Sequence, residues 1–540
     1  MKKQQRIHPE YPKRMLRMTM LITGLTLLGF RAAGQGIPPF ADLHCHSFLK
    51  PFYSGWGNPW EFHEHECPTT SYDMVLEKAG SVPKFTQSNF ESMLLGNVKV
   101  AYLSLTPLEY EMRHPKIFRD LEKLRNSYAC MAGITPNWEF FLDKKVDYWQ
   151  ELMANMQQLI RGNRQPFLAG KDTLFYEVVG SGSQLQRVLG QKNRLAVILS
   201  IEGAHCLGQG PLTPELLASA DYQEEILEHV DVLKGIRPMN AEGEMLPFPV
   251  CVMTLNHFMW NGLSGHAKTF GQVEGYLLDQ TEGLNTGVTP LGEKVIRRLL
   301  DKDNGRRILI DVKHMGVESR RWYYRHLADR RLNGDTIPVV ATHCGVAGNS
   351  WWTIATARNG NDQNKVSWLH QAPIAMFDED VHEIFATRGI LGLMLDKYRC
   401  GGALGNALVD ETREGSIQRR KAYIHLLVAN MLEVVDVIKC KEAWDIIALG
   451  SDFDGMINAM EPYDQAIKLP TLRDDLIAYF EAPEDIFDLF PKRKVQRYMF
   501  GLSAEEIVNK VMGGNLLVFT KRMLDQEIAS GQAAEGKSEK

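Results

Sequence analysis

Residues 40–46 read FADLHCH, and they place two histidines one residue apart directly behind a short apolar segment. Such a segment predicts a β-strand that ends near His46. The two-residue period of a strand puts His44 and His46 on one face, where both imidazoles can meet one metal ion. A pair of this kind also occurs in ordinary loops, so its interpretation depends on the rest of the chain.

Four later stretches repeat the pattern of an apolar run that ends in a metal-ligand type of residue. They are residues 196–203 with Glu202, 308–314 with His314, 339–343 with His343, and 446–452 with Asp452. Further apolar runs at 98–105, 251–257 and 390–395 predict strands, and helices are predicted in segments 284–300, 318–332 and 416–437. In the first of these segments, the sequence TPLGE at 289–293 predicts a helix start with Pro290 near the first helical position. Strands that alternate with helices predict a parallel α/β fold, and ligand-type residues at many strand ends favour a closed (β/α)8 TIM-like barrel over an open sheet.

The length and composition are compatible with one large barrel domain. The chain has 540 residues, and residues 37–530 are expected to form a single barrel with insertions at about 47–97, 205–245 and 349–372. Residues 531–540 are expected to be a disordered tail. The net charge of −5 and the lack of a basic stripe exclude a typical nucleic-acid-binding protein.

The first 36 residues have the order of a secretory signal peptide. Basic residues precede an uncharged apolar run at 18–30, and small residues follow at 32–34. The run is shorter than the roughly 20 residues of a membrane-spanning helix. An uncleaved N-terminal anchor is the alternative. We therefore expect export to a periplasmic or extracellular location, with membrane attachment only if this segment is retained.

Two other sets of residues leave alternatives open. The cluster at 63–67, HEHEC, is either a second metal site or a polar loop, and the loop is favoured because no strand frames the cluster. Most of the eight cysteines are expected to be free thiols that are buried in the protein interior. One disulfide is left open among Cys67, Cys130, Cys251, Cys400 and Cys440.

The candidate ligands are residue types that bind divalent metal ions. Neutral imidazoles and carboxylates suit zinc or a similar divalent ion. Four histidines with one carboxylate suit two ions that share the carboxylate and a water, whose pKa is thereby lowered. This interpretation assigns His44 and His46 to one ion, His314 and His343 to the other, and Glu202 to the bridge. Asp452 then remains to move a proton between the attacking water and the leaving group.

The ordered motifs also resemble a known family. The stretches SIEGAH at 200–205, TLNH at 254–257, DVKH at 311–314, ATH at 341–343 and GSDFDG at 450–455 look like successive motifs of the membrane (renal-type) dipeptidases in the amidohydrolase superfamily. The segments at 501–507 and 513–517 resemble that family's ending, so the resemblance spans about residues 40 to 525.

The resemblance implies a barrel of the metal-dependent hydrolase type with two zinc ions that hydrolyses dipeptides. It implies Glu202 as the bridging ligand, His314 and His343 as ligands of the second ion, and Asp452 as the acid and base. It also implies that His257 binds substrate and polarises the scissile carbonyl, and that Tyr398 contacts substrate.

Two departures from the family pattern bear on the substrate. The family commonly has His-x-Asp at the first strand, whereas this chain has His44 and His46, which removes one negative charge. The family's arginine for the substrate carboxylate has Arg358 as its nearest candidate here. A bidentate arginine would select a free C-terminal carboxylate.

The expected function is that of an exported, metal-dependent dipeptidase. Hydrolysis of a lactone, an N-acyl amino acid or a β-lactam is the alternative activity at the same site. A barrel that binds ligands without turnover is the alternative from another class. A dipeptide or another small molecule is the expected partner, and a homodimer is left open.

Overall fold

The computed structural model describes residues 37–55, 57–64, 82–114, 144–270, 278–351, 368–487 and 489–535, with side chains as far as residue 525. The chain divides into Met1–Pro38 and Pro39–Lys540, and the fold described below is that of the second unit. The segment expected to be a signal peptide or anchor lies outside the described residues.

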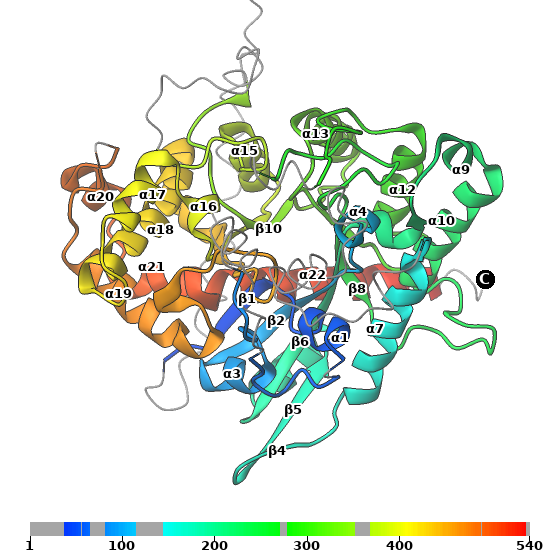
Figure 1. The fold of residues 1–540 in the computed structure, drawn as a ribbon, viewed down its shortest axis with the longest axis horizontal. Helices are drawn as coiled ribbons and strands as arrows, with labels where there is room; N and C mark the ends of the chain where they lie inside the picture. The colour runs from blue at the N-terminus through cyan, green and yellow to red at the C-terminus, as the bar shows by residue number, and fades with distance from the viewer. Residues whose placement is uncertain are drawn as a thin grey trace, which may run out of the picture. The chain divides into compact units, whose positions relative to one another are not determined.

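Eight parallel strands close into a barrel (Figure 1). They are β1 (Phe40–Cys45), β2 (Val98–Leu105), β6 (Arg194–Glu202), β8 (Val250–Thr254), β9 (Leu309–Asp311), β10 (Val340–Cys344), β11 (Ile390–Leu393) and β12 (Ile447–Leu449). Each strand pairs with the next along the chain, and β12 returns to pair with β1. The predicted (β/α)8 barrel is confirmed. Each of the eight strands overlaps the apolar run that predicted it, and β6, β8 and β10 extend one or two residues beyond that run at one end.

The smaller strands were not predicted from the sequence. Strands β4 (Phe167–Ala169) and β5 (Asp172–Val178) form a hairpin, and β5 runs parallel to the first half of β6. A two-stranded ribbon joins β3 (Val146–Asp147) to β7 (Gln209–Gly210). Glu177 interrupts the apolar pattern of β5, and its buried carboxylate is paired with Arg164 at 2.6 Å and with Arg187.

Helices alternate with the barrel strands. The longer ones are α7 (Tyr148–Gly162), α8 (Gly182–Leu189), α10 (Ala220–Leu233), α12 (Pro290–Leu300), α13 (Val317–Leu332), α15 (Asp378–Ala386), α17 (Ala403–Asp410), α18 (Ile417–Ile438), α19 (Leu469–Glu481) and α22 (Asn515–Glu535). Short helices are α1 (Leu49–Tyr53), α3 (Phe90–Leu95), α4 (Tyr110–Arg113), α9 (Pro214–Ala218), α16 (Lys397–Cys400), α20 (Lys492–Tyr498) and α21 (Ala504–Asn509). None of the helices in the described ranges combines the length and hydropathy needed to cross a membrane.

The predicted helices 318–332 and 416–437 correspond to α13 and α18, and the helix start predicted at Thr289-Pro290 within 284–300 is that of α12. The Thr289 hydroxyl accepts a hydrogen bond from the Gly292 amide at 3.0 Å and caps α12. Proline is favoured at the first helical position because it has no amide hydrogen to leave unpaired. The local cap therefore decides where this helix begins.

The C-terminal segment packs against the start of two barrel strands. The Asn515 side chain donates to the Trp444 carbonyl at 2.6 Å and to the Ile447 carbonyl at 2.7 Å. Gly513 lies so close to β1 that a Cβ there would be 2.4 Å from the Pro39 carbonyl oxygen. Helix α22 then continues to Glu535, into the segment expected to be a tail.

The described cysteines and insertions have structural roles. Cys45, Cys206, Cys251, Cys344, Cys400 and Cys440 are free, while Cys67 and Cys130 lie outside the described residues.

In the first insertion, Trp60 is buried and stacks on Phe167 with ring centroids 5.0 Å apart. Trp351 stacks on Tyr324 of α13 at 5.9 Å.

Replacing Glu433 of α18 with glutamine should stabilise the protein at pH 8 relative to pH 5. Burial, followed by the charges of Asp436 and Asp378, raises the pKa of Glu433 from 4.5 to about 7. A raised carboxyl pKa contributes stability below pH 4.5 that is lost as the pH rises through 7, and glutamine does not titrate. We expect a relative gain of about 1–3 kcal/mol in the free energy of unfolding at pH 8.

Urea unfolding of both proteins at pH 5 and pH 8 measures this gain. The exposed Glu411→Gln is the matched control and should show no such dependence on pH. The prediction would be contradicted if the free energies of unfolding of Glu433→Gln and the wild type differed by the same amount at both pH values.

Candidate metal centre

The end of β1 brings two imidazoles together inside the barrel. His44 and His46 are buried, and their Nε2 atoms lie 3.0 Å apart. Cys45 between them turns its sulfur toward the Tyr102 carbonyl, 3.5 Å away. Side chains alternate along a strand, so one intervening residue is what places both histidines on the same side.

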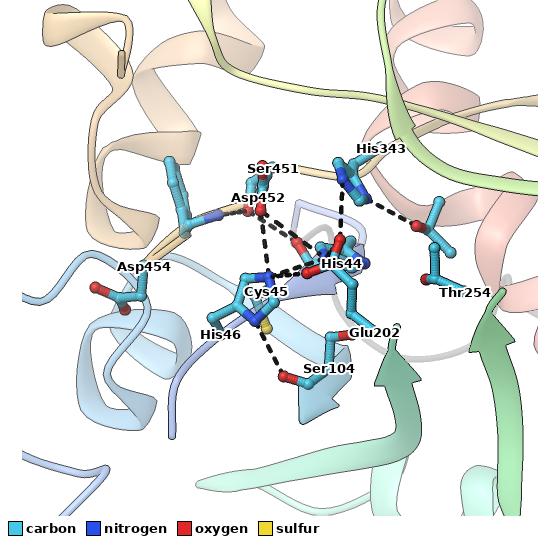
Figure 2. A network of polar contacts seen from close by, with 12 residues as sticks. His44, Cys45, His46, Ser104, Glu202, Thr254, His343, Ser451, Asp452 and Asp454 are labelled. Atoms are coloured by element: carbon cyan, nitrogen blue, oxygen red, sulfur yellow. Dashed lines mark hydrogen bonds and ion pairs between the residues drawn. The ribbon is translucent and has the colours of Figure 1, made fainter. Parts of the chain in front are cut away.

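The Glu202 carboxylate, at the end of β6, lies close to two pairs of histidines, and Figure 2 shows it beside His44, His46 and His343. Its Oε2 is 3.1 Å from Nε2 of His46. Its Oε1 is 3.3 Å from Nε2 of His314 and 3.4 Å from Nε2 of His343. One carboxylate therefore faces both pairs: Oε2 is nearest to His46, while Oε1 is near His314 and His343 and also lies 3.6 Å from Nε2 of His44.

Outer hydrogen bonds direct the Nε2 atoms inward. His46 Nδ1 lies 3.1 Å from the Ser104 carbonyl, to which only an N–H can donate. His343 Nδ1 donates to the Thr342 hydroxyl at 2.9 Å, because that hydroxyl donates in turn to Asp311 at 2.6 Å. With the proton on Nδ1, each Nε2 presents a lone pair, as a metal ligand requires.

The residues fit a bound cation. His44, His46 and Glu202 form one group able to hold a metal ion, and Glu202, His314 and His343 form another. Both groups are buried and consist of imidazole nitrogens and carboxylate oxygens, which suits zinc or a similar ion. The sequence-predicted ligands are thus brought to one place.

Asp311 has a positioning role, although it lies near His44 and His343 and forms a third group with them. Its carboxylate accepts hydrogen bonds from the Thr254 hydroxyl at 2.7 Å and the Thr342 hydroxyl at 2.6 Å, and from backbone amides of Thr342 and Lys313. These donors occupy its oxygens and join β8, β9 and β10.

Asp452 lies directly after β12, with its Oδ1 3.3 Å from Nε2 of His46. The backbone angle φ of Asp452 is 59°, and that of His314 is 64°. Residues other than glycine rarely adopt positive φ values of this kind. Backbone strain of this kind is maintained where the surroundings fix a functional geometry. A Cβ at Gly455 would lie 2.3 Å from Asp452 Oδ1, so glycine is required there.

The neighbouring Asp454 fixes the loop that carries Asp452. Its carboxylate accepts hydrogen bonds from the Gln87 amide at 2.8 Å and from the Ser88 amide at 2.8 Å. Asp42 acts similarly at the other end of the loop, accepting from the Ser451 amide at 2.9 Å. The two carboxylates tie the end of β12 to β1 and to the first insertion.

The two histidine pairs differ electrostatically. Burial lowers the pKa of His314 to about 3, and burial followed by the charge of His44 lowers that of His343 well below its usual range. Burial also opposes protonation of His46, but hydrogen bonds to Asp452 and Glu202 outweigh it and raise its pKa to about 10. His314 and His343 are therefore neutral near pH 7, whereas His46 must release a proton to bind a cation.

His257, just after β8, lies beside Glu202. Its Nε2 is 3.6 Å from Glu202 Oε2, and its Nδ1 is 2.9 Å from Oε2 of Glu109. Sequence reasoning missed Glu109, because a lone glutamate before a short polar helix carries no recognisable signal. It also missed Lys313, a buried lysine whose pKa is lowered by burial and by the charge of Arg399.

The structure does not bring Tyr398 to this centre. Its side chain is exposed on α16, and its ring lies 4.7 Å from the Lys397 ammonium. Within the described ranges no contact joins it to Glu202 or Asp452. Arg358 and most of the cluster at 63–67 lie outside the described residues. His63 of that cluster lies 3.9 Å from Glu61.

The fold and the site define a (β/α)8 barrel with a buried histidine–carboxylate centre at the carboxyl ends of its strands. No protein-family model matches the chain, and no curated protein does. Among solved structures, an amidohydrolase from Pseudomonas aeruginosa is similar at 13% identity and a TM-score of 0.41, over 81% of this chain and 90% of that one.

Two peptidases are similar to the same degree. A metallo peptidase from Rhodobacter sphaeroides, bound to a phosphinate mimic of L-Ala-D-Ala, has 14% identity and a TM-score of 0.43, over 88% of this chain and 100% of that one. A probable dipeptidase from Pseudomonas aeruginosa has 12% identity and a TM-score of 0.43, over 92% and 96%. At this level of similarity a functional assignment has to rest on the site itself.

Proposed function

We propose that this protein is a metal-dependent hydrolase that cleaves a small amide bond, most simply that of a dipeptide. The observation that carries the proposal is the Glu202 carboxylate, whose two oxygens lie 3.1 to 3.4 Å from His46, His314 and His343, histidines of both pairs. A shared carboxylate between two imidazole pairs is the donor set of a two-metal hydrolytic site.

Five residues are proposed as the metal ligands. His44 and His46 would hold one divalent ion and His314 and His343 the other, with Glu202 shared. Zinc suits these ligands, and two such ions supply an activated water and a Lewis acid for the scissile carbonyl.

Asp452 is placed to move the proton. Its Oδ1 lies 3.3 Å from His46 Nε2, on the edge of the centre where a water held near His46 would contact it. The carboxylate takes a proton from the attacking water and returns it to the leaving nitrogen, so that one water yields a carboxylic acid and an amine. A hydroxyl leaving group would accept the same proton, which is why lactones and acyl derivatives are the alternative substrates.

His257 is placed to bind the substrate carbonyl. It is 5% exposed and directs Nε2 toward Glu202, while its ring packs on Phe258 with centroids 3.8 Å apart. Burial opposes protonation of His257, but the charges of Glu109 and Glu202 outweigh it and raise the pKa of the ring, so the ring can carry a proton on both nitrogens. A hydrogen bond donated by Nε2 to the carbonyl oxygen would stabilise the negative charge that develops there.

Metal analysis and a dipeptide assay on one purified sample test the proposal. We expect about two divalent ions per chain, hydrolysis of dipeptides, and loss of both after treatment with a chelator. Zinc should restore the activity of the stripped protein. Two bound ions without dipeptide cleavage would direct the search to lactones, N-acyl amino acids and β-lactams. Failure to bind any divalent ion would overturn the catalytic proposal in favour of a binding protein.

The location of the protein is proposed from its first 36 residues alone. Their order of basic, apolar and small residues supports export, with cleavage after the small residues. The mass of the chain isolated from its native source decides between a cleaved signal and a retained anchor.

A further inference from the structure

We propose that Glu109 is a positioning residue that holds His257 in its working orientation. This inference rests on the proposed function for its catalytic consequence, but the contact itself can be tested without any activity. Glu109 is neither a candidate metal ligand nor the residue proposed to transfer the proton, so this inference gives it a role of its own.

The contact is direct and buried. Glu109 Oε2 lies 2.9 Å from His257 Nδ1, and both side chains are at most 5% exposed. Glu109 Oε1 accepts a hydrogen bond from the Met259 amide at 2.8 Å, two residues beyond the histidine. The carboxylate is therefore attached at the same time to the ring and to the backbone that carries it.

The topology explains why this pairing controls the ring. Glu109 follows β2, His257 follows β8, and β6, which ends in Glu202, lies between those two strands in the barrel. The histidine is thus placed between two carboxylates, with Nδ1 toward Glu109 and Nε2 toward Glu202. A carboxylate only accepts hydrogen bonds, so at a separation of 2.9 Å a proton on Nδ1 is what would make this contact attractive. The ring then keeps Nε2 toward the centre.

Among the described residues, the structure records no other hydrogen-bond or ion-pair partner for Nδ1 of His257. The other ring contacts of His257 are with Phe258 at 3.8 Å, His314 at 5.1 Å and His205 at 6.1 Å, and these stacking contacts do not distinguish Nδ1 from Nε2. On its other side Glu109 borders a cavity of about 20 Å³, room for about one water. Loss of the carboxylate would therefore leave the ring free to turn over, with solvent replacing its partner.

Glu111 provides a matched control. It is two residues away, borders the same cavity and is partly buried, but the structure gives it no contact with His257. The Glu109→Gln and Glu111→Gln variants make the same chemical change within one short segment. A difference between them reports the contact with His257 and not a general effect on the cavity.

The kinetic experiment compares Glu109→Gln, Glu109→Asp and Glu111→Gln in the metal-loaded enzyme. Loss of an outer hydrogen-bond partner typically lowers activity about 10- to 100-fold. We expect a decrease of that size in kcat for Glu109→Gln, a change in KM below about twofold, and unchanged metal content. Glu109→Asp keeps the charge and should recover part of the rate, while Glu111→Gln should remain at the wild-type level.

Wild-type kcat in Glu109→Gln would overturn the proposal. So would an equal loss in Glu109→Gln and Glu111→Gln, since that result indicates only a structural role. If Glu109→Gln folds poorly, Glu109→Asp takes its place in both experiments. Wild-type kcat in a well-folded Glu109→Asp, together with an unshifted ring N–H signal in the NMR experiment below, would then overturn the proposal.

Proton NMR of the ring N–H groups tests the contact in a protein of any activity. A proton shared between Nδ1 and a carboxylate should give a far-downfield signal, assigned by its disappearance in His257→Asn. Glu109→Gln should shift this signal upfield, because an amide oxygen is a weaker acceptor than a carboxylate, and Glu111→Gln should leave it in place. An unshifted signal in Glu109→Gln overturns the inference, whereas an inactive wild-type enzyme with the expected shift refutes only the proposed function.

Discussion

Glutamine in place of Glu202 is expected to reduce the bound metal to one ion per chain or fewer and to lower kcat/KM more than about 100-fold. Outer-shell partners of a metal alone account for roughly 10- to 100-fold, and Glu202 contacts both histidine pairs directly. The amide nitrogen of glutamine would also direct hydrogens at an imidazole lone pair, either at His46 or at His314 and His343. Metal analysis and zinc titration, beside the kinetic assay, measure the two effects.

The same substitution at Glu111 serves as the control, because that residue lies outside the histidine cluster. Circular dichroism should show that Glu202→Gln keeps the fold, since the barrel core is apolar around the site. Two firmly bound ions in Glu202→Gln would contradict the bridging role, whatever the activity of the variant.

Asparagine in place of Asp452 should separate metal binding from proton transfer. We expect kcat to fall about 10²- to 10⁴-fold, the usual contribution of a general acid or base, while metal content stays at the wild-type value. The side chains are almost the same size, so the left-handed turn at Asp452 and its close contact with Gly455 should be preserved.

Asp474→Asn is the control for this variant, because that carboxylate is 72% exposed and is paired with Arg473, which is not among the candidate site residues. Activity of Asp452→Asn within about tenfold of the wild type would assign the proton transfer elsewhere. Loss of metal together with activity would instead indicate that Asp452 is a ligand.

The barrel was predictable because its signals are local. Each buried parallel strand is an apolar run that ends in a polar residue, as in residues 446–452, and each long helix has a periodic apolar face. Strand β5 was missed because Glu177 breaks its pattern, and the ion pairs that neutralise this charge are formed by residues outside the strand.

The grouping of the candidate ligands was predictable for a related reason. His44, His46, Glu202, His314 and His343 lie at or just beyond the ends of apolar strands, and closing the barrel brings the carboxyl ends of all strands to one rim. The resemblance of the ordered motifs to dipeptidases added the expected role of His257. The prediction for Tyr398 rested on a weak local match, and the structure leaves that side chain exposed on α16.

The order of residues along the chain was thus sufficient for the strands, the closed barrel and the histidines and carboxylate at its rim. It could not reveal that Asp311 is saturated with hydrogen bonds or that Glu109 contacts His257. Glu109 and His257 are 148 residues apart, and their contact at 2.9 Å depends on the stacking of β2, β6 and β8 side by side. Residue types follow local chemistry, but distances between side chains arise only when the strands that carry them are packed together.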